Sequence, residues 1–329
     1  MGTRTLWLKD DGAIHEAYGG NKPRKLVHLL EDAARKRKHH LLTVGAAGSH
    51  HVLATAILGK LAGFSSTALL LPRPYSCHAE QTTLQAKAAD AELISLISLS
   101  DAPRIIRMVL RRDSYFIPPG GSNALGALGY LEALLELEQQ IHAGDLPEPE
   151  LIFVALGSGG TAAGILAGLA TSSLRSRLVA IPVLSLPTPR RIVLALAERA
   201  LRLTGRTPNR PLDSLLEIDA RWIGPGYGQI TQAGETAIAF AAQYGLLLES
   251  TYTGKAFAAC QGWLRGPIDR GNVLARAAEM LTPRLKEGAT NHPKHALFWS
   301  TISSRLLSPF KPGKATLPQS IARLLRVPS

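Results

Sequence analysis

Short apolar runs and longer amphipathic stretches alternate along most of the chain. The apolar runs predict strands over residues 41–44, 66–71, 92–96, 114–117, 151–156, 177–183 and 296–299, with an edge strand over residues 6–9. Between them, apolar positions recur with the spacing of a helix face, as at residues 26–34, 53–61, 78–89, 103–110, 128–135, 190–203 and 233–244. Strands that alternate with helices indicate an α/β protein with two open twisted domains and mostly parallel sheets. The run at residues 151–156 has few polar atoms, so we expect it at the centre of a sheet, covered on both faces.

Proline and glycine clusters interrupt this pattern. Residues 118–123, Pro-Pro-Gly-Gly-Ser-Asn, are expected to end one lobe and to cap the long helix that follows. Residues 145–150 carry two prolines and are expected to form a surface linker. Residues 266–295 are charged and predict partly helical structure, and the basic tail after residue 309 is expected to be poorly ordered.

Composition narrows the class of protein. With 329 residues, of which 46% are hydrophobic and 19% charged, the chain is long enough for two domains with sizeable cores. No apolar run reaches the roughly 18 residues that a membrane span needs, and the first residues lack a signal-peptide pattern. The two cysteines lie far apart in the sequence and do not indicate a disulfide framework. We therefore expect a cytoplasmic protein with no membrane partner.

The net charge of +12, from 37 Lys and Arg against 25 Asp and Glu, opens the alternative of a nucleic-acid binder. Such a protein would show a salt-sensitive affinity for DNA or RNA. The basic residues are spread out, however, and aromatic residues make up only 5% of the chain, so no stacking platform accompanies the charge. The charge pattern favours a solvated basic surface, and no nucleic-acid partner is predicted.

A glycine turn before the first helix carries a candidate lysine. Gly19 and Gly20 allow a tight turn, and Pro23 suits the first position of a helix. Because the residue before a proline is disfavoured in the α region, we expect Lys22 just outside the helix, with its amine projecting from the turn. Lys25 follows one turn later, near the positive end of the helix, where a phosphate would be stabilised. The alternative is an ordinary solvated basic helix start.

A second glycine-rich turn follows the predicted strand at residues 41–44. It leads through residues 45–48 to Ser49, His50 and His51, which open the next helix. This arrangement places Ser49 at the edge of a parallel sheet, where ligands bind, although Ser49 also suits a plain helix N-cap. Adjacent histidines point apart and no partner cluster follows, so no metal site is predicted.

A third loop, residues 157–161, comes straight after the strand expected at the sheet centre. Backbone N–H groups and hydroxyls at a helix start converge on an anion, so the loop indicates a phosphate site. No lysine follows the last glycine, which excludes a Walker loop, and the dinucleotide spacing is also missing. The alternative is a tight turn that lets helix and strand approach closely.

Six motifs occur in an order that resembles one family. They lie at residues 19–26, 45–49, 118–123, 157–161, 224–228 and 252–255. The chain resembles the pyridoxal-phosphate-dependent group that contains aminocyclopropane-carboxylate (ACC) deaminase and D-cysteine desulfhydrase, over roughly residues 6–305. The resemblance implies the fold of the tryptophan synthase β subunit. It further implies a large pyridoxal-phosphate-binding domain over residues 1–36 and 128–329, and a small domain over residues 37–127 that carries the Ser49 loop.

The resemblance also implies roles for individual residues. Lys22 matches the lysine that holds the cofactor as a Schiff base, and Lys25 matches a lysine that contacts its phosphate. Ser49 matches a serine that contacts the substrate. The phosphate loop is matched by Gly157, Ser158, Gly159, Gly160 and Thr161.

Other matched positions lie around the cofactor ring. Tyr227 and Tyr252 match two active-site tyrosines, and Thr253 matches the position that faces the pyridine nitrogen. Deaminases of the family have Glu at this last position and Leu in a final His-Leu-Gly-Gly motif, whereas desulfhydrases have Thr at both. This chain has Thr253 and Thr301. A neutral hydroxyl leaves the ring a weaker electron sink, which suits loss of a good β-leaving group better than opening of a cyclopropane.

Two of the departures from the family pattern lie within its motifs, and residues 266–295 resemble an insertion. His50 stands where the family usually has Asn in contact with the cofactor's phenolic oxygen, and a histidine can still donate a hydrogen bond there. The usual His-Thr-Gly-Gly reads Ser-Thr-Ile-Ser at residues 300–303.

These residues predict a pyridoxal-phosphate-dependent β-elimination lyase on a small amino acid, similar to D-cysteine desulfhydrase, that releases pyruvate, ammonia and a thiol or sulfide. Lys22 is expected to take the α-proton, Ser49 to hold the carboxylate, and Tyr227 or Tyr252 to steer the leaving group. The alternatives are an ACC deaminase and a cofactor-binding homologue with altered or no turnover. The family also implies a homodimer.

Overall fold

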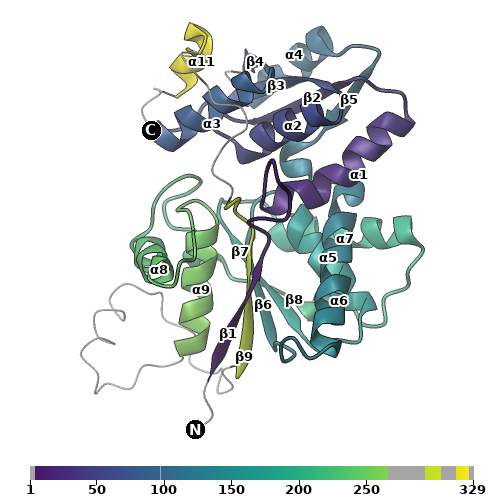
Figure 1. Cartoon of the computed structure of the whole chain (residues 1–329), viewed down its shortest axis with the longest axis vertical. Helices are drawn as coiled ribbons and strands as arrows, with labels where there is room; N and C mark the ends of the chain where they lie inside the picture. The colour runs from purple at the N-terminus through teal and green to yellow at the C-terminus, as the bar shows by residue number, and fades with distance from the viewer. Residues whose placement is uncertain (1–3, 97, 266–292, 305–315, 326–329) are drawn as a thin grey trace. The chain divides into compact units, whose positions relative to one another are not determined.

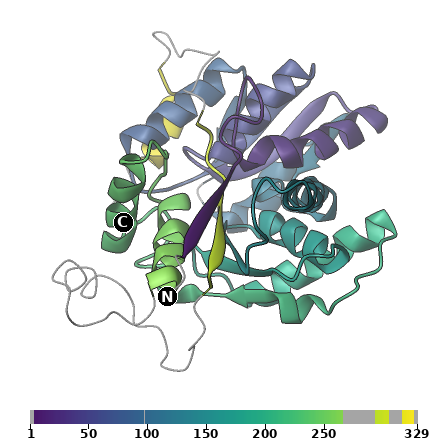
Figure 2. The ribbon, with the colours of Figure 1, turned by 60° about the horizontal axis from the view of Figure 1, so that its bottom comes forward.

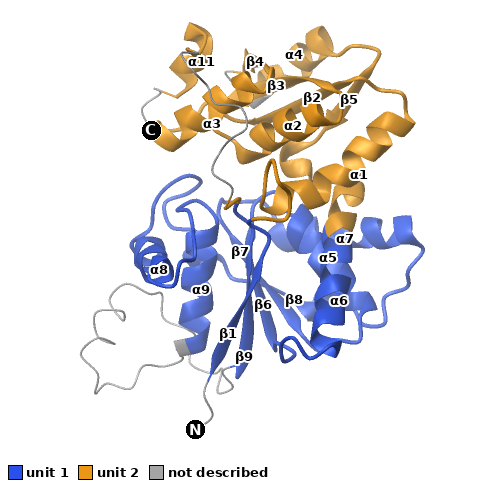
Figure 3. Ribbon diagram, in the orientation of Figure 1, with its two compact units in different colours: residues 1–12, 130–302 blue, residues 13–129, 303–329 orange. Residues whose placement is uncertain are grey.

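The computed structural model describes residues 4–96, 98–265, 293–304 and 316–325. The chain divides into two compact units, which are described separately (Figure 3). Unit 1 comprises Met1–Gly12 and Tyr130–Ile302, and unit 2 comprises Ala13–Gly129 and Ser303–Ser329. Among the described residues, no helix is long and apolar enough to span a lipid bilayer.

Unit 1 is built on a five-stranded sheet in the order β1-β9-β6-β7-β8, and every pairing in it is parallel. Its strands are β1 (Thr5–Asp10), β6 (Leu151–Leu156), β7 (Arg177–Pro182), β8 (Leu216–Ile218) and β9 (His295–Ser300). Strand β6 is central and wholly buried, and β1 pairs only with β9, so the predictions of a covered central strand and an edge strand are confirmed.

Helices cover both faces of this sheet (Figures 1 and 2). On one face, α8 (Gln232–Ala242) and α9 (Thr253–Arg265) pack on side chains such as Phe153 and Phe298. The other face carries α6 (Gly160–Thr171), α7 (Pro189–Thr204) and the part of α5 (Ala124–His142) that belongs to unit 1, from Tyr130 on. Helix α6 is buried from Gly160 to Ala170, because its small residues let neighbouring helices approach; a Cβ on Gly168 would lie 2.7 Å from Leu134 Cβ.

A buried carboxylate ties β1, α5 and β9 of unit 1 together. Asp11 Oδ2 accepts hydrogen bonds from the Tyr130 hydroxyl and from Trp299 Nε1, the latter at 2.8 Å. The two rings pack edge to face, with centroids 5.6 Å apart. Because a buried carboxylate is costly unless hydrogen-bonded, this arrangement fixes the end of β1 in place.

Unit 2 is built on a four-stranded parallel sheet in the order β4-β3-β2-β5. Its strands are β2 (His40–Ala46), β3 (Ser65–Leu71), β4 (Glu92–Ser95) and β5 (Ser114–Ile117). Helices α1 (Asn21–Arg35), α2 (His50–Leu61) and α3 (Cys77–Ala88) bury their apolar faces against one side of the sheet. Helix α4 (Ala102–Val109) packs on the opposite side against Leu42, Val44 and Leu69.

The fold class and the order of strands and helices follow the sequence predictions, with two kinds of exception. Strand β8 and the short 3-10 turns η1 (Leu99–Asp101), η2 (Pro119–Gly121), η3 (Leu212–Leu215) and η4 (Ala220–Trp222) were not predicted. The tail after residue 309 was expected to be poorly ordered, but it contains α11 (Gln319–Leu324), whose Ile321 and Leu324 are buried in the core of unit 2. Most of the stretch at residues 266–295 lies outside the described residues.

The units differ in extent from the domains expected from the resemblance. Residues 13–36, including α1, and the tail from residue 303 belong to unit 2 and not to the unit of the five-stranded sheet. The physical reason is burial: Leu26 and Leu29 of α1 lie in the same core as the side chains of α2. Which unit binds the cofactor and which carries the substrate loop stays a prediction.

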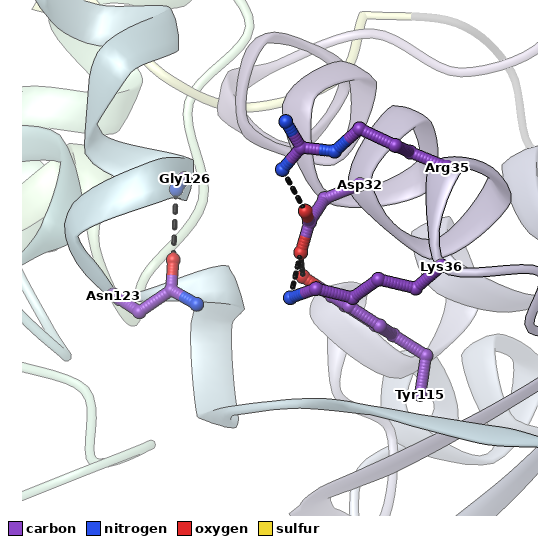
Figure 4. A network of polar contacts seen from close by, with 6 residues as sticks. All are labelled: Asp32, Arg35, Lys36, Tyr115, Asn123 and Gly126. Carbon is purple, nitrogen blue, oxygen red and sulfur yellow. Dashed lines mark hydrogen bonds and ion pairs between the residues drawn. The ribbon is translucent and has the colours of Figure 1, made fainter. Parts of the chain in front are cut away.

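A carboxylate on α1 holds this helix to β5 (Figure 4). Asp32 accepts hydrogen bonds from Lys36 Nζ and the Tyr115 hydroxyl, each at 2.7 Å, and from the Arg35 guanidinium. Burial of Asp32 raises its pKa, but these three donors outweigh burial and lower the pKa to about 2.

We predict that Asp32→Asn lowers the free energy of unfolding by about 1–3 kcal/mol, because two cationic donors and the half-buried Tyr115 hydroxyl lose an ionic acceptor. The measurement is urea-induced unfolding at pH 7. The matched control is Asp90→Asn, which removes an exposed ion pair with Lys60 and should change stability by about 0.5 kcal/mol or less. Equal losses in the two variants would contradict the role given to Asp32.

Candidate functional site

In unit 2 the glycine turn ends where α1 begins. Gly20 has φ 76° and precedes Asn21, the first residue of α1. The expectation that Lys22 stands just outside the helix is therefore wrong: Lys22 and Pro23 both lie in its first turn. A proline is accepted there because the first four N–H groups of a helix have no partner within it. The half-buried Lys22 donates from Nζ to Asn21 Oδ1 at 2.6 Å.

Lys25 lies one turn further along α1 and is 2% exposed. Its Nζ donates to the carbonyl oxygen of Gly120 at 3.2 Å and to Ser122 Oγ at 3.4 Å. Burial, followed by the positive charge of Lys22, lowers the pKa of Lys25 well below its usual value. Within unit 2, the two predicted cofactor lysines are thus close enough to repel each other.

The loop at residues 118–123 accepts the hydrogen bonds of Lys25. It lies between β5 and α5, as predicted. Gly120 and Gly121 have φ of 70° and 63°, which turns the chain sharply after β5. Asn123 Oδ1 then accepts from the backbone N–H of Gly126 at 2.8 Å, so Asn123 caps the start of α5 (Figure 4).

Ser49 caps the start of α2. Its Oγ accepts from the backbone N–H of His51 at 3.2 Å, so the N-cap interpretation is confirmed, while contact with a substrate stays a prediction. The loop before it fits tightly. A Cβ on Gly48, which has φ 78°, would lie 2.5 Å from Ala79 in the first turn of α3.

Both ring nitrogens of His50 have partners within unit 2. The Tyr18 hydroxyl lies 2.7 Å from His50 Nδ1, and His78 Nε2 lies 2.8 Å from His50 Nε2. Burial lowers the pKa of His50 to about 3, and His78, Lys22 and Arg73 lower it in the same direction. The sequence indicated His50 as a donor to a cofactor oxygen; in this structure a ring N–H would have to leave Tyr18 or His78 to do so.

His51 points away from His50, as expected of adjacent histidines. Its Nε2 lies 2.8 Å from Thr43 Oγ1, whose hydroxyl donates to the carbonyl oxygen of Ile117. Thr43 therefore accepts from His51 Nε2–H, which leaves Nδ1 as an acceptor that is buried without a hydrogen-bond partner among the described residues. Burial lowers the pKa of His51, and the charges of Lys22 and Lys25 add to this effect. No group of three or more potential metal-binding side chains occurs among the described residues.

In unit 1 the predicted phosphate loop joins β6 to α6. Gly159 is the N-cap of α6 and has φ 94°, which favours glycine. The first turn of α6 has no acidic residue, so nothing there opposes an anion at the positive end of the helix. A Cβ on Gly157 would lie 2.9 Å from Cε1 of Tyr252, so the loop runs directly against this ring. Gly160 and Thr161 are buried, and Ser158 is exposed.

The two predicted tyrosines are neighbours in unit 1. The Tyr252 hydroxyl donates to that of Tyr227 at 3.1 Å, and the rings pack edge to face with centroids 5.9 Å apart. Lys255 fixes the loop that carries Tyr227: it is fully buried and donates to the carbonyl oxygens of Ile223 at 2.7 Å and Gly226 at 3.0 Å. The sequence analysis included Lys255 in the motif at residues 252–255 but predicted no role for it, because the residues that it binds are about thirty positions away in the sequence.

Glu249 organises the turn that leads into α9. Its carboxylate accepts from the backbone N–H groups of Thr251, Tyr252 and Thr253, at 2.7, 2.7 and 2.8 Å. Thr253 Oγ1 accepts from the backbone N–H of Glu249 at 2.9 Å and lies 3.3 Å from the Glu249 carboxylate. The Thr253 hydroxyl is thus used within its own turn, and its expected contact with a ring nitrogen stays a prediction.

At the end of β9, Ser300 is fully buried, and its Oγ has no hydrogen-bond partner among the described residues. Thr301, the predicted cofactor residue, follows it and is half-buried. Sequence reasoning treated Ser300 only as a departure from a motif. The burial of Ser300 could not be predicted from the sequence, because it depends on how the sheet packs against its helices.

Comparisons with known proteins agree with these motifs. The family described as "Pyridoxal-phosphate dependent enzyme" matches residues 1–276. A D-cysteine desulfhydrase from Klebsiella pneumoniae subsp. pneumoniae is 34% identical over 275 residues, which cover 78% of this chain and 80% of that protein.

Solved structures show the same fold. The crystal structure of an ACC deaminase homologue has a TM-score of 0.70 at 26% identity, and the match covers 91% of this chain and 84% of that one. A fungal L-serine ammonia-lyase from Rhizomucor miehei has a TM-score of 0.59 at 17% identity, with 92% and 89% covered. A hydrogen sulfide-producing enzyme from Fusobacterium nucleatum has a TM-score of 0.57 at 12% identity, with 92% and 91% covered.

The residues of unit 1 fit a pyridoxal phosphate. The glycine loop offers a helix start without opposing charge, and its Gly157 has no room for a side chain beside Tyr252. Ser300 holds a buried hydroxyl without a partner among the described residues, at the same carboxyl edge of the sheet from which this loop departs. A buried polar group of this kind is costly unless a ligand satisfies it.

Acid should destabilise the protein through its buried histidines. His51 stays neutral in the folded protein and is protonated in the unfolded chain below about pH 6.5, so the unfolded state gains protons and stability falls as the pH drops from there. Each such histidine adds up to about 1.4 kcal/mol per pH unit to the slope of the free energy of unfolding against pH. Urea unfolding of the wild type and His51→Gln between pH 7 and 5 should show a smaller slope in the variant. A His51→Gln slope equal to that of the wild type would contradict the prediction.

Lys255→Met should weaken turnover more than cofactor binding. The substitution leaves two carbonyl oxygens without their donor, so the loop of Tyr227 loosens and stability falls by about 1–3 kcal/mol. Steady-state kinetics, with cofactor content measured by absorbance, separates the two effects. Lys87→Met, which removes an exposed ammonium group, is the control and should leave both quantities unchanged. Full turnover in Lys255→Met would show that the Tyr227 loop needs no such anchor.

Proposed function

This chain belongs to the pyridoxal-phosphate dependent enzymes, and we propose that it is a lyase that eliminates the β-substituent of D-cysteine or a similar small amino acid. The observation that carries this proposal is the 34% identity to a D-cysteine desulfhydrase over 80% of that protein's length. Thr253 and Thr301 support it, because desulfhydrases of the family have Thr at these two positions, whereas ACC deaminases have Glu and Leu.

Each group of residues has a proposed part in holding the cofactor. Lys22 would form the covalent bond to its aldehyde, and the backbone of residues 157–161 would hold its phosphate at the start of α6. The Ser300 hydroxyl would be available to the ring nitrogen, and Thr253 and Thr301 lie in the same unit. When bound, the cofactor supplies a ring that delocalises the negative charge left on the substrate α-carbon.

The remaining steps belong to side chains of this chain. The Lys22 amine takes the α-proton as a general base. The Ser49 hydroxyl, at the start of α2, hydrogen-bonds the substrate carboxylate, and the positive helix end adds to its attraction. The hydroxyl of Tyr227 or Tyr252 donates to the leaving sulfur. Overall, cysteine and one water give pyruvate, ammonia and hydrogen sulfide.

A second candidate is deamination of ACC, which the structural match to an ACC deaminase homologue favours. Opening an unactivated ring needs a stronger electron sink than a hydroxyl at the ring nitrogen provides. The departures at His50 and residues 300–303 leave a third alternative, a cofactor-binding homologue without turnover.

We also propose that the enzyme works as a homodimer in the cytoplasm. Both cysteines are unpaired, Cys77 exposed and Cys260 buried, as suits a reducing compartment. Light scattering on the purified protein tests the dimer, and a mass of one chain would contradict it.

The purified enzyme should release pyruvate and sulfide from D-cysteine, and Lys22→Ala should lower kcat by at least about a hundredfold through loss of the general base. The assay measures both products from D- and L-cysteine, D-serine and ACC. Lys38→Ala, at a half-buried lysine that donates to the carbonyl oxygen of Arg112, is the control and should keep full activity. Ketobutyrate from ACC with no sulfide from D-cysteine would establish the second candidate instead.

A further inference from the structure

Tyr18, His50 and His78 form a continuous hydrogen-bonded chain in unit 2. Tyr18 is 3% exposed and directly precedes the glycine turn of Lys22. His50 lies between the other two, and His78, in the first turn of α3, is exposed to solvent. The hydrogen-bonded chain thus runs from solvent at His78 to the buried hydroxyl of Tyr18, four residues before the predicted cofactor lysine in the sequence.

A single N–H···N hydrogen bond joins the rings of His50 and His78. Their Nε2 atoms are 2.8 Å apart and their centroids only 4.9 Å apart, so the two nitrogens face each other nearly in line. A metal ion would have to separate or rotate the rings, whereas an N–H···N hydrogen bond needs this in-line arrangement. One Nε2 therefore carries a hydrogen and the other accepts it.

The Tyr18 hydroxyl can donate to either of two acceptors on His50. It lies 2.7 Å from His50 Nδ1 and 3.3 Å from the carbonyl oxygen of His50. If Nδ1 accepts, His50 carries its hydrogen on Nε2 and donates to His78. If Nδ1 carries the hydrogen, Tyr18 accepts it and turns its own hydrogen to the carbonyl, and His78 becomes the donor to His50. Every hydrogen bond in the chain then reverses direction.

We propose that His78 is a positioning residue that sets the tautomer of His50, and through it the direction of the Tyr18 hydroxyl. A neutral His78 accepts at Nε2, and the shorter Tyr18 contact then places the hydrogen of His50 on Nε2. A protonated His78 carries hydrogens on both nitrogens, cannot accept, and forces the hydrogen of His50 to Nδ1. An exposed imidazole changes its charge between about pH 5 and 8.

The surroundings keep His50 itself neutral while this happens. Lys22 of α1, Arg73 after β3 and His78 of α3 all oppose a charge on it, and burial lowers its pKa to about 3. Tyr75, Cys77 and Glu80 lie close to His78 in the sequence, around the start of α3, and the Tyr75 hydroxyl donates to Glu80 at 2.9 Å. The switch is therefore a change of tautomer without a change in the charge of His50.

The test is imidazole ¹⁵N NMR of the holoenzyme labelled in its histidines, at pH 8 and pH 5.5, with His50 assigned by its absence in His50→Asn. In the wild type, the hydrogen of His50 should move from Nε2 at pH 8 to Nδ1 at pH 5.5. In His78→Ala, and in His78→Gln, where the amide oxygen still accepts from Nε2, this shift should be lost. The exposed His39→Gln should keep it.

A single His50 tautomer at both pH values in the wild type would overturn the proposal. So would a double protonation of His50, or a shift that persists without His78. Turnover tests the consequence for the site and rests on the proposed function. The kcat of the wild type should change with pH over the same interval, and this change should be absent in His78→Gln. The pH profile of kcat should also be the same in His50→Asn and in the double variant that combines His50→Asn with His78→Gln.

The two proposals fail separately. Absence of pyruvate and sulfide from every amino acid would contradict the proposed lyase and leave the NMR result to decide the switch. Identical kcat profiles in the wild type and His78→Gln would overturn the role of His78 in the site, whatever the substrate.

Discussion

The parallel pairing of every strand that the structure describes is the constraint on which the rest of the fold depends. In a parallel sheet each strand is followed by a crossover, so successive loops and helix starts gather at the carboxyl edge. In unit 1 this edge carries the loop at residues 157–161 and the end of β9, and in unit 2 it carries Ser49 and the loop after β5. The chemistry proposed for this chain uses backbone N–H groups and small side chains, which are what such edges present.

Polar side chains fix three loops of the two units in place. Lys255 holds the loop of Tyr227 by two carbonyl oxygens, Glu249 gathers three backbone N–H groups before α9, and Lys25 binds the loop after β5. A buried charge of this kind is costly unless its hydrogen bonds are satisfied. These contacts restrict the loops to one arrangement, which is the condition for precise positioning at an enzyme site.

Local patterns were sufficient to predict the parts of the fold that are decided locally. The apolar run at residues 151–156 predicted β6 because a strand buried on both faces has no polar positions, and Ser49 predicted the start of α2 because its hydroxyl suits a helix N-cap. Strand β8 has only three residues, too few to show a period, and α11 is helical only because Ile321 and Leu324 find a core. Lys22 was misplaced because the preference of a residue before proline is weaker than a helix start set by Gly20.

The polar contacts of the candidate site were beyond sequence reasoning, because they join residues far apart in the chain. The Tyr18–His50–His78 chain spans sixty residues, and the burial of Ser300 depends on the whole sheet.

The central claim is that the Lys22 amine binds the aldehyde of pyridoxal phosphate. Borohydride reduction of the purified holoenzyme, followed by peptide mapping, tests it most directly. The account predicts a visible absorption band that reduction abolishes, and a cofactor mass fixed on the peptide that contains Lys22. A colourless protein after incubation with pyridoxal phosphate, or a label on another lysine such as Lys25 or Lys255, would contradict it.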